Sequence, residues 1–187
     1  DKAMVGMLVA TDAADPYMDP HYMLQKLKTH HYIREHLAGG KVVKYGAKTV
    51  TIGGWGSVPK LYTDGCMIAG DSASFLNPMR VKGIHLAMKS GMLAAEAAFE
   101  AMVAGDGSAK VLQSYSDKVH ASWIKQEMEP AKNMHANFAD GMVRGLFRMG
   151  ADYAFGPGDL KKTSPDHAHM HKKADATAPE PLEYDGT

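Results

Sequence analysis

One stretch of the chain constrains its fold more than any other: a short apolar run, then a glycine and an acidic residue, then a long helical pattern. Residues 66–69 are suited to a buried strand, Gly70 lets the backbone turn without a clash at Cβ, and Asp71 follows directly. A loop over residues 72–82 leads to the helical pattern that opens at Gly83. A strand joined to a helix in this way predicts an α/β or α+β fold.

The groups around this loop suit an electron-rich ligand. A carboxylate at Asp71 can accept a hydrogen bond from a ribityl hydroxyl. The backbone N–H groups at the start of the helix, at Gly83, Ile84 and His85, have no partner inside the helix and form a positive end. Such an end suits the pyrimidine edge of a flavin or a phosphate group. The alternative interpretation is a buried strand followed by a capping Asp.

A longer match in the sequence makes the flavin hypothesis more specific. It takes in the loop, the start of the helix and short motifs along the chain, at residues 15–17, 28, 30, 33–34, 39–41, 45–47, 53–54, 57–60, 70–77, 80–85, 87–96 and 181–184. With these residues the chain resembles the electron transfer flavoprotein-ubiquinone oxidoreductases almost from end to end.

This resemblance implies a fold, an activity and a set of cofactors. The fold is part of an FAD-binding domain of the glutathione-reductase type and part of an inserted quinone-binding domain with an antiparallel sheet. The whole enzyme passes electrons from reduced electron transfer flavoprotein to ubiquinone through FAD and a 4Fe-4S cluster. The implied FAD-binding residues are Gly70, Asp71, Lys82, Gly83, Ile84 and His85. We expect no catalytic side chain, because the cofactors carry this chemistry and the protein positions and tunes them.

Two features expected of such an enzyme are missing from the sequence. A GxGxxG turn after a strand normally holds the FAD pyrophosphate, but Gly54 and Gly56 are followed by Val58 and Pro59 rather than by a third glycine. The family's cluster needs four cysteine thiolates, whereas Cys66 is alone, and we interpret it as a small buried strand residue. We therefore expect an internal segment of a longer protein, inactive by itself.

The expected organisation has four segments. They are a quinone-binding part at residues 1–52, an FAD-binding part at 53–130, a membrane-surface helical segment at 131–156 and an extended linker toward an iron-sulfur domain at 157–187. In the linker His167, His169 and His171 alternate, but without a carboxylate or cysteine constellation nearby. We predict no metal site there.

Periodicity predicts the elements within these segments. We expect a strand at residues 4–11, one or two helices over 20–37, and short β-branched strands at 42–45 and 49–52. The helix from Gly83 should end at the glycines of residues 105–107. Its apolar face, which should pack on a sheet, comprises Ile84, Met88, Gly91, Ala95, Ala98 and Met102. A second helical stretch is predicted over residues 108–129.

Residues 131–155 carry a second functional pattern. Apolar side chains recur at helical spacing, at Phe138, Met142, Leu146, Phe147 and Met149. Arg144 and Arg148 supply cations for lipid head groups, which is typical of a helix lying in a bilayer surface. The alternative is a core helix or a face covered by another domain, and the glycines at 141, 145 and 150 argue against one long rigid helix. The resemblance favours the membrane, because the family is monotopic.

The resemblance also sets the expected partners and location. The partners are electron transfer flavoprotein, ubiquinone and a membrane surface, either the cytoplasmic face of a bacterial inner membrane or the matrix face of the mitochondrial one. Two alternatives are a flavin-dependent reductase of isoprenoid chains, related in fold, and a non-catalytic membrane-associating module.

Composition agrees with a folded domain of ordinary type. Of 187 residues, 45% are hydrophobic and 22% charged, and 21 basic residues balance 21 acidic ones. A chain without net charge has no general electrostatic attraction to nucleic acid, so we expect no such partner. No apolar run approaches the roughly 20 residues of a membrane span.

Overall fold

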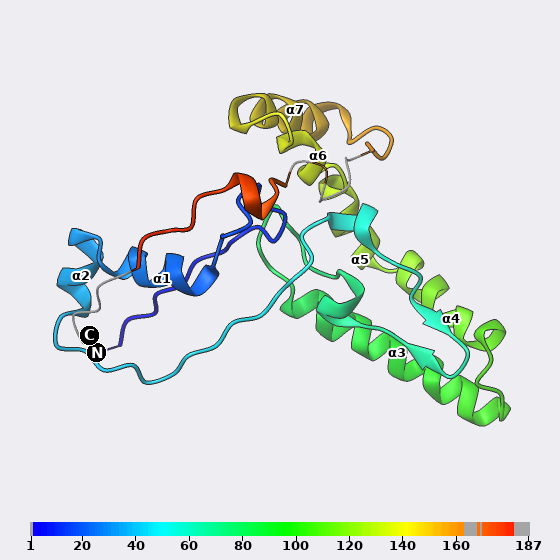
Figure 1. Cartoon of the computed structure of the whole chain (residues 1–187). Helices are drawn as coiled ribbons and strands as arrows, with labels where there is room; N and C mark the ends of the chain where they lie inside the picture. The colour runs from blue at the N-terminus through cyan, green and yellow to red at the C-terminus, as the bar shows by residue number, and fades with distance from the viewer. Residues whose placement is uncertain (1, 163–167, 169, 182–187) are drawn as a thin grey trace. The chain divides into compact units, whose positions relative to one another are not determined.

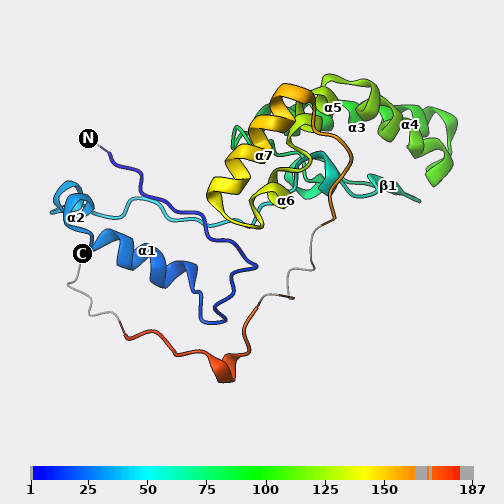
Figure 2. The ribbon, with the colours of Figure 1, turned by 90° about the horizontal axis from the view of Figure 1, so that it is seen from above.

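The computed structural model describes residues 2–162, 168 and 170–181, which fall into two compact units. The first unit is built from residues 1–47 and 164–187, and the second from Lys48–Thr163. Figures 1 and 2 trace the chain from blue at the N-terminus to red at the C-terminus.

The first unit contains α1 (Pro20–Lys28) and α2 (His31–Leu37). α1 begins where Asp19 Oδ1 accepts a hydrogen bond from the backbone N–H of His21 at 2.8 Å. Pro20 occupies the first helical turn, where its missing N–H leaves nothing unpaired. After α2 the backbone reverses at Gly39, whose φ is 74°. The prediction of one or two helices over residues 20–37 is therefore confirmed.

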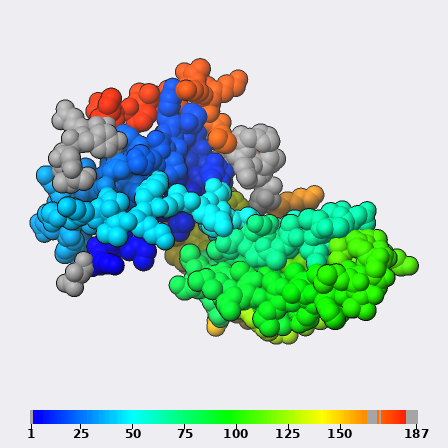
Figure 3. Space-filling view, turned by 90° about the horizontal axis from the view of Figure 1, so that it is seen from below, coloured from blue at the N-terminus to red at the C-terminus, as the bar shows by residue number. Residues whose placement is uncertain are grey.

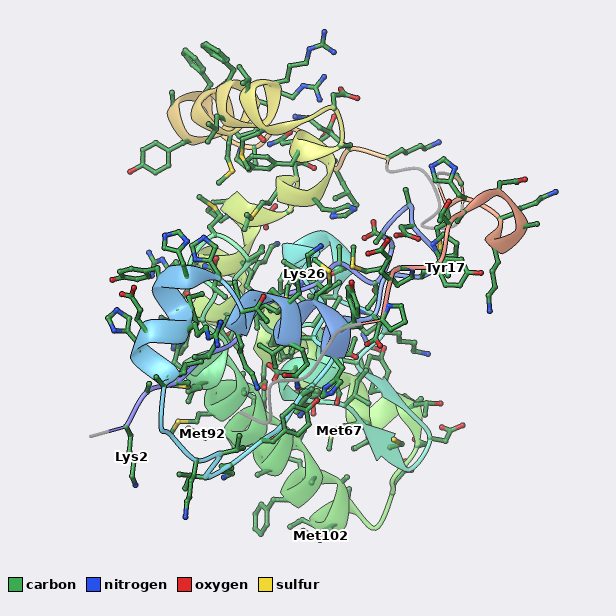
Figure 4. The ribbon with its side chains drawn as sticks, turned by 60° about the vertical axis from the view of Figure 1, so that its left-hand side comes forward. Lys2, Tyr17, Lys26, Met67, Met92 and Met102 are labelled. Atoms are coloured by element: carbon green, nitrogen blue, oxygen red, sulfur yellow. The ribbon has the colours of Figure 1, made fainter. Side chains whose placement is uncertain are left out.

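Contacts between distant parts of the sequence hold this unit together. The backbone N–H of His171 donates to the carbonyl oxygen of Ala14 at 2.8 Å. The Lys173 ammonium lies over the ring of Tyr17, 5.2 Å from its centroid, where the short 3-10 helix η5 (Lys173–Asp175) begins. Figure 4 labels Tyr17 beside this turn. His167 and His169 lie outside the described residues.

The predictions of strands at residues 4–11, 42–45 and 49–52 are wrong. These residues are described without any ladder pairing, and Val42 and Val43 are exposed. Their β-branched side chains suit a strand, but a strand is stable only when it pairs with others and covers an apolar face. In the described part of the chain, pairing is limited to one two-stranded sheet and one isolated bridge.

That sheet belongs to the second unit. β1 (Tyr62–Thr63) and β2 (Cys66–Met67) are antiparallel and turn at Gly65, whose φ is 67°. The unit also contains α3 (Ile84–Ala104), α4 (Ala109–Ala121) and α5 (Trp123–Met128). α4 packs against β1, and α3 and α5 pack against α4 and against each other. Their common core contains the buried side chains of Leu61, Phe75, Leu86, Tyr115, Val119, Ile124 and Met128. The fold class is thus α+β, which is one of the two classes predicted from the sequence.

Short elements complete the second unit. They are the 3-10 helices η1 (Gly54–Ser57), η2 (Gly70–Ala73) and η3 (Glu129–Ala131), and the α-helices α6 (Met134–Phe138) and α7 (Met142–Phe155). Figures 1 and 2 show α4 lying along α3, and α7 folding back beside α6.

Tyr115 supplies a polar anchor inside this core. Its ring is fully buried, and its hydroxyl donates to the carbonyl oxygen of Ile68 at 3.0 Å, just after the hairpin. Burial raises the pKa of Tyr115 to about 12, because the phenolate would be poorly solvated there. The hydrogen bond ties α4 to the segment that leads into the site.

Cys66 corrects one expectation. The cysteine is in a strand as predicted, but it is exposed rather than buried. Successive side chains of a strand point to opposite faces, and here the half-buried Met67 takes the core-facing position. A two-stranded hairpin has only one covered face, so its neighbour faces outward.

The predicted packing face of α3 also needs correction. The helix ends at Gly105 in the left-handed conformation, as predicted, but it buries Leu86, Ser90, Leu93, Ala97 and Ala101. The predicted face is exposed, with Ile84 at 81% and Met102 at 72%. α3 carries apolar residues on both sides, and the side with Leu86, Leu93 and Ala97 is the buried one. Figure 4 shows Met92 and Met102 projecting from α3, and Figure 3 shows the green surface that this helix presents.

Candidate functional site

The candidate site begins at the turn after the hairpin. Gly70 has a φ of 64°, in the left-handed region that favours glycine. Its N–H donates to Ser90 Oγ at 2.9 Å, and its carbonyl oxygen accepts from Phe75 at 3.1 Å. A Cβ at Gly70 would lie 3.4 Å from the Ala87 Cβ. The turn is thereby fixed against the first turns of α3.

The loop that follows is closed by Asn77. The backbone N–H of Asn77 donates to the carbonyl oxygen of Lys82 at 2.9 Å. Asn77 Oδ1 accepts from the backbone N–H groups of Met79 and Arg80, at 3.0 and 3.3 Å. Val81 has a φ of 52°, an uncommon conformation for a β-branched residue. Strained backbone of this kind clusters at functional sites, where the surrounding structure holds it in place.

A cavity of about 340 Å³ lies between this loop and the start of α3. Its lining residues are Asp71, Leu76, Gly83, Ile84, Ala87 and Met88. Glycine at position 83 lets the loop approach the helix start closely, because a Cβ there would lie 3.1 Å from Asp71 Oδ1 and 3.3 Å from the Phe75 carbonyl oxygen. No side chain caps the N-terminus of α3. A carboxylate and the positive end of a long helix therefore share one cavity.

The predicted FAD-binding residues have different surroundings. Asp71, Gly83 and Ile84 line the cavity, and Gly70 lies next to Ala87, another lining residue. Lys82 contributes backbone to the bridge with Asn77, and its side chain is exposed.

The His85 side chain points elsewhere. Its Nε2 lies 2.9 and 3.0 Å from the two carboxylate oxygens of Glu127, and its ring stacks on Trp123. Sequence reasoning missed Glu127 and Trp123, because no local pattern links α5 to residues some forty positions earlier.

The second set of predicted residues lies on α6 and α7. Met142, Leu146 and Phe147 are exposed, the last at 78%. Phe138 and Met149 are half-buried, and the Phe138 ring packs against Gly145, where an added Cβ would overlap it. Three of the five predicted side chains are therefore exposed apolar residues of α7. Phe138 instead packs from α6 against α7 at Gly145.

Charges flank this face. Arg148 Nη1 pairs with Asp140 Oδ2 at 2.7 Å, while Arg144 lies on the same helix and is exposed. Among the described residues, no helix combines the length and the apolar character needed to span a bilayer. In the same residues no group of three or more His, Cys, Asp or Glu is arranged to hold a metal ion.

Comparison with known proteins identifies relatives along most of the chain. Residues 1–50 match the family model described as the ubiquinone-binding domain of ETF-QO. An electron transfer flavoprotein-ubiquinone oxidoreductase of Oryza sativa is 40% identical over 167 residues, covering 87% of this chain and 28% of the relative. Its counterparts in Pseudomonas aeruginosa and Homo sapiens are 34% and 33% identical, over 94% and 96% of this chain. The chain spans about a third of the length of these curated relatives.

Proposed function

We propose, on the premise that this chain belongs to the electron transfer flavoprotein-ubiquinone oxidoreductase family, that it forms part of the FAD site and part of the quinone-binding region of such an enzyme. The whole protein would pass electrons from reduced electron transfer flavoprotein to ubiquinone. Residues 1–52 would serve the quinone, 53–130 the FAD, and 131–156 the membrane surface, with 157–187 as connector.

The observation that carries the proposal is the shared cavity of Asp71 and the α3 N-terminus. FAD, when bound, supplies the acceptance and release of electrons. Asp71 would accept a hydrogen bond from a ribityl hydroxyl, and the N–H groups of Gly83, Ile84 and His85 would face the pyrimidine edge. The positive helix end would favour the negative charge that reduction places there. The cavity volume lies in the range of small-molecule sites and would hold one part of so large a cofactor.

The residues present do not fit an iron-sulfur cluster. A 4Fe-4S centre of this family needs four thiolates, and the chain contributes one cysteine, Cys66, on the outer face of β2. No step of the proposal therefore runs through a cluster held by this chain.

The membrane part of the proposal rests on α7. Its open apolar face and adjacent arginines suit a helix that lies in the head-group region of a bilayer. In that position it would bring the protein to the layer in which ubiquinone dissolves. The proposed location is the surface of the membrane that carries the quinone pool, on the cytoplasmic side in bacteria or the matrix side in mitochondria.

The test is Asp71→Ala in the full-length gene product, with Asp106→Ala as a matched control. Asp106 precedes α4 and is exposed, and its Oδ1 accepts a hydrogen bond from the backbone N–H of Ser108 at 2.8 Å. A hydrogen bond to a charged group contributes roughly 1.5–3 kcal/mol, so Asp71→Ala should weaken FAD binding about ten- to a hundredfold. Flavin content and affinity equal to those of the control would overturn the assignment.

A further inference from the structure

Glu127 connects two parts of the candidate site from a different element. It lies on α5, and its carboxylate contacts both the loop over residues 77–82 and the first turn of α3. The His85 Nε2 lies 2.9 and 3.0 Å from its two oxygens, and Asn77 Nδ2 donates to its Oε1 at 3.3 Å. Asn77 Nδ2 also lies 3.3 Å from the Glu127 carbonyl oxygen.

The contact with His85 orients the start of α3. His85 is the second residue of this helix; its Nε2 contacts the carboxylate, and the face of its ring stacks on Trp123. The two rings are nearly parallel, at 2°, with centroids 5.7 Å apart. A ring fixed at two points restricts rotation of the first helical turn. The N–H groups of that turn are therefore held in one direction.

The contact with Asn77 fixes the loop. The Asn77 side chain is buried, at 3% exposure, and its amide group is engaged at both ends. Its oxygen accepts from the loop backbone, and its nitrogen donates to Glu127. Arg80 adds a weak ion pair to the same carboxylate, at 3.8 Å. The groups around the carboxylate, His85, Asn77 and Arg80, thus all belong to the loop or to the helix start.

We propose that Glu127 is a positioning residue for the flavin: it holds the loop and the α3 N-terminus together, and so sets where the N–H groups of Gly83, Ile84 and His85 lie relative to Asp71. This inference rests on the proposed function. It assigns to α5 a role in tuning the cofactor, although no residue of α5 lines the cavity. The favourable effect of a helix end falls off within a turn, so small displacements of this end change it.

The test compares Glu127→Ala and Glu127→Gln in the full-length gene product loaded with FAD. Both variants remove the same negative charge, but Gln keeps an oxygen that accepts hydrogen bonds. The difference between them therefore reports positioning rather than charge. Glu129→Ala is the control, because Glu129 pairs with Lys125 and Lys132, at 3.9 and 3.3 Å, in the neighbouring η3.

Two measurements are made on each variant: the flavin midpoint potential, and amide hydrogen exchange over residues 77–86. We expect the potential of Glu127→Ala to lie below that of Glu127→Gln, and exchange to be roughly tenfold faster in the Ala variant, as loss of one to two kcal/mol of hydrogen bonding predicts. Glu129→Ala should match the wild type in both. Equal potentials in the two Glu127 variants, with wild-type exchange, would overturn the proposal.

His85→Ala keeps the inference testable if Glu127→Ala does not fold. The His85 side chain is 43% exposed, so its removal leaves the core intact while breaking the same link. It should also speed exchange over residues 77–86, and unchanged exchange would count against positioning. Retention of flavin by Asp71→Ala would reject the flavin site itself, whereas exchange reports the Glu127 link whether or not flavin is bound.

Discussion

α3 and α7 both expose apolar side chains, but the charges beside them differ. On α3 the neighbouring acids Glu96 and Glu100 pair with Lys118 of α4, at 3.7 and 2.6 Å. The hydrogen bond from Lys118, joined by one from Ser114, lowers the pKa of Glu100, so this carboxylate stays ionised. On α7 the neighbouring groups are Arg144 and Arg148, the second of which pairs with Asp140 at 2.7 Å.

This difference in charge indicates whether the exposed apolar face of each helix contacts lipid or protein. Anionic lipid head groups attract the arginines of α7, whereas the acids of α3, paired with Lys118, offer no such attraction. We therefore expect the α7 face to meet lipid, and the α3 face to meet protein, as its sequence pattern predicts. Exposure of apolar side chains alone does not separate these two cases.

The largest expected effect comes from placing negative charge on the exposed apolar face of α7. In the full-length gene product, Leu146→Asp with Phe147→Asp should weaken binding to anionic phospholipid vesicles about a hundredfold or more. Burial of each such side chain contributes roughly 1.5–3 kcal/mol, as an upper bound at a wet interface. Vesicle sedimentation measures the effect.

Met102→Asp with Val103→Asp on α3 is the matched control for that variant, because both of these residues are also exposed. It should sediment with vesicles as the wild type does. If the α7 variant binds normally, its face is a core or domain contact. Equal loss in both variants would show that the charge pattern does not distinguish the two helices.

A smaller effect is expected at the glycines of α7. Gly145→Ala places a Cβ into the Phe138 ring and should lower the free energy of unfolding by about 1–3 kcal/mol, the usual cost of overpacking. Gly150→Ala in the same helix meets no atom within 4 Å and should raise it by up to about 1 kcal/mol. Denaturant unfolding measures both. Equal effects of the two changes would mean that α7 does not lie on α6 as described.

The smallest expected change in the free energy of unfolding is at Gly91 on α3. It tests most directly whether the exposed α3 face is covered by other protein. A Cβ there also meets no atom within 4 Å, so Gly91→Ala should stabilise the 187-residue chain by up to about 1 kcal/mol. If other protein covers this face in the full-length gene product, the same change should destabilise that product. Stabilisation in both would indicate an α3 face that stays open, contrary to our expectation.

The bounds of α3 could be predicted because their signals are local. Gly83 and Gly105 flank a continuous helical pattern, and Gly105 provides the left-handed end that such helices prefer. The buried face could not be predicted, because apolar side chains occur on both sides of the helix. The stretch predicted over residues 108–129 breaks at Ser122, whose hydroxyl accepts from Ile124 at 3.2 Å and starts α5.

The candidate site shows the same division between local and distant information. Asp71 and Gly83 belong to one short motif, and the structure brings them to one cavity. Glu127 was missed because its contacts join positions 42 and 50 residues apart, which leave no periodic trace in a single sequence. The strand predictions failed for a related reason: a β-branched segment does not specify its partner.

The loop between Ser74 and Val81 has a consequence for ligand affinity. Both residues hold positive φ values, 62° and 52°, and the bridge at Asn77 closes the segment between them. Fixing the backbone of one residue costs roughly 1–2 kcal/mol of conformational entropy. Here that ordering happens when the chain folds, so a ligand entering beside Asp71 finds the loop already arranged. Binding then loses little entropy, and preorganisation of this kind strengthens affinity without adding a contact.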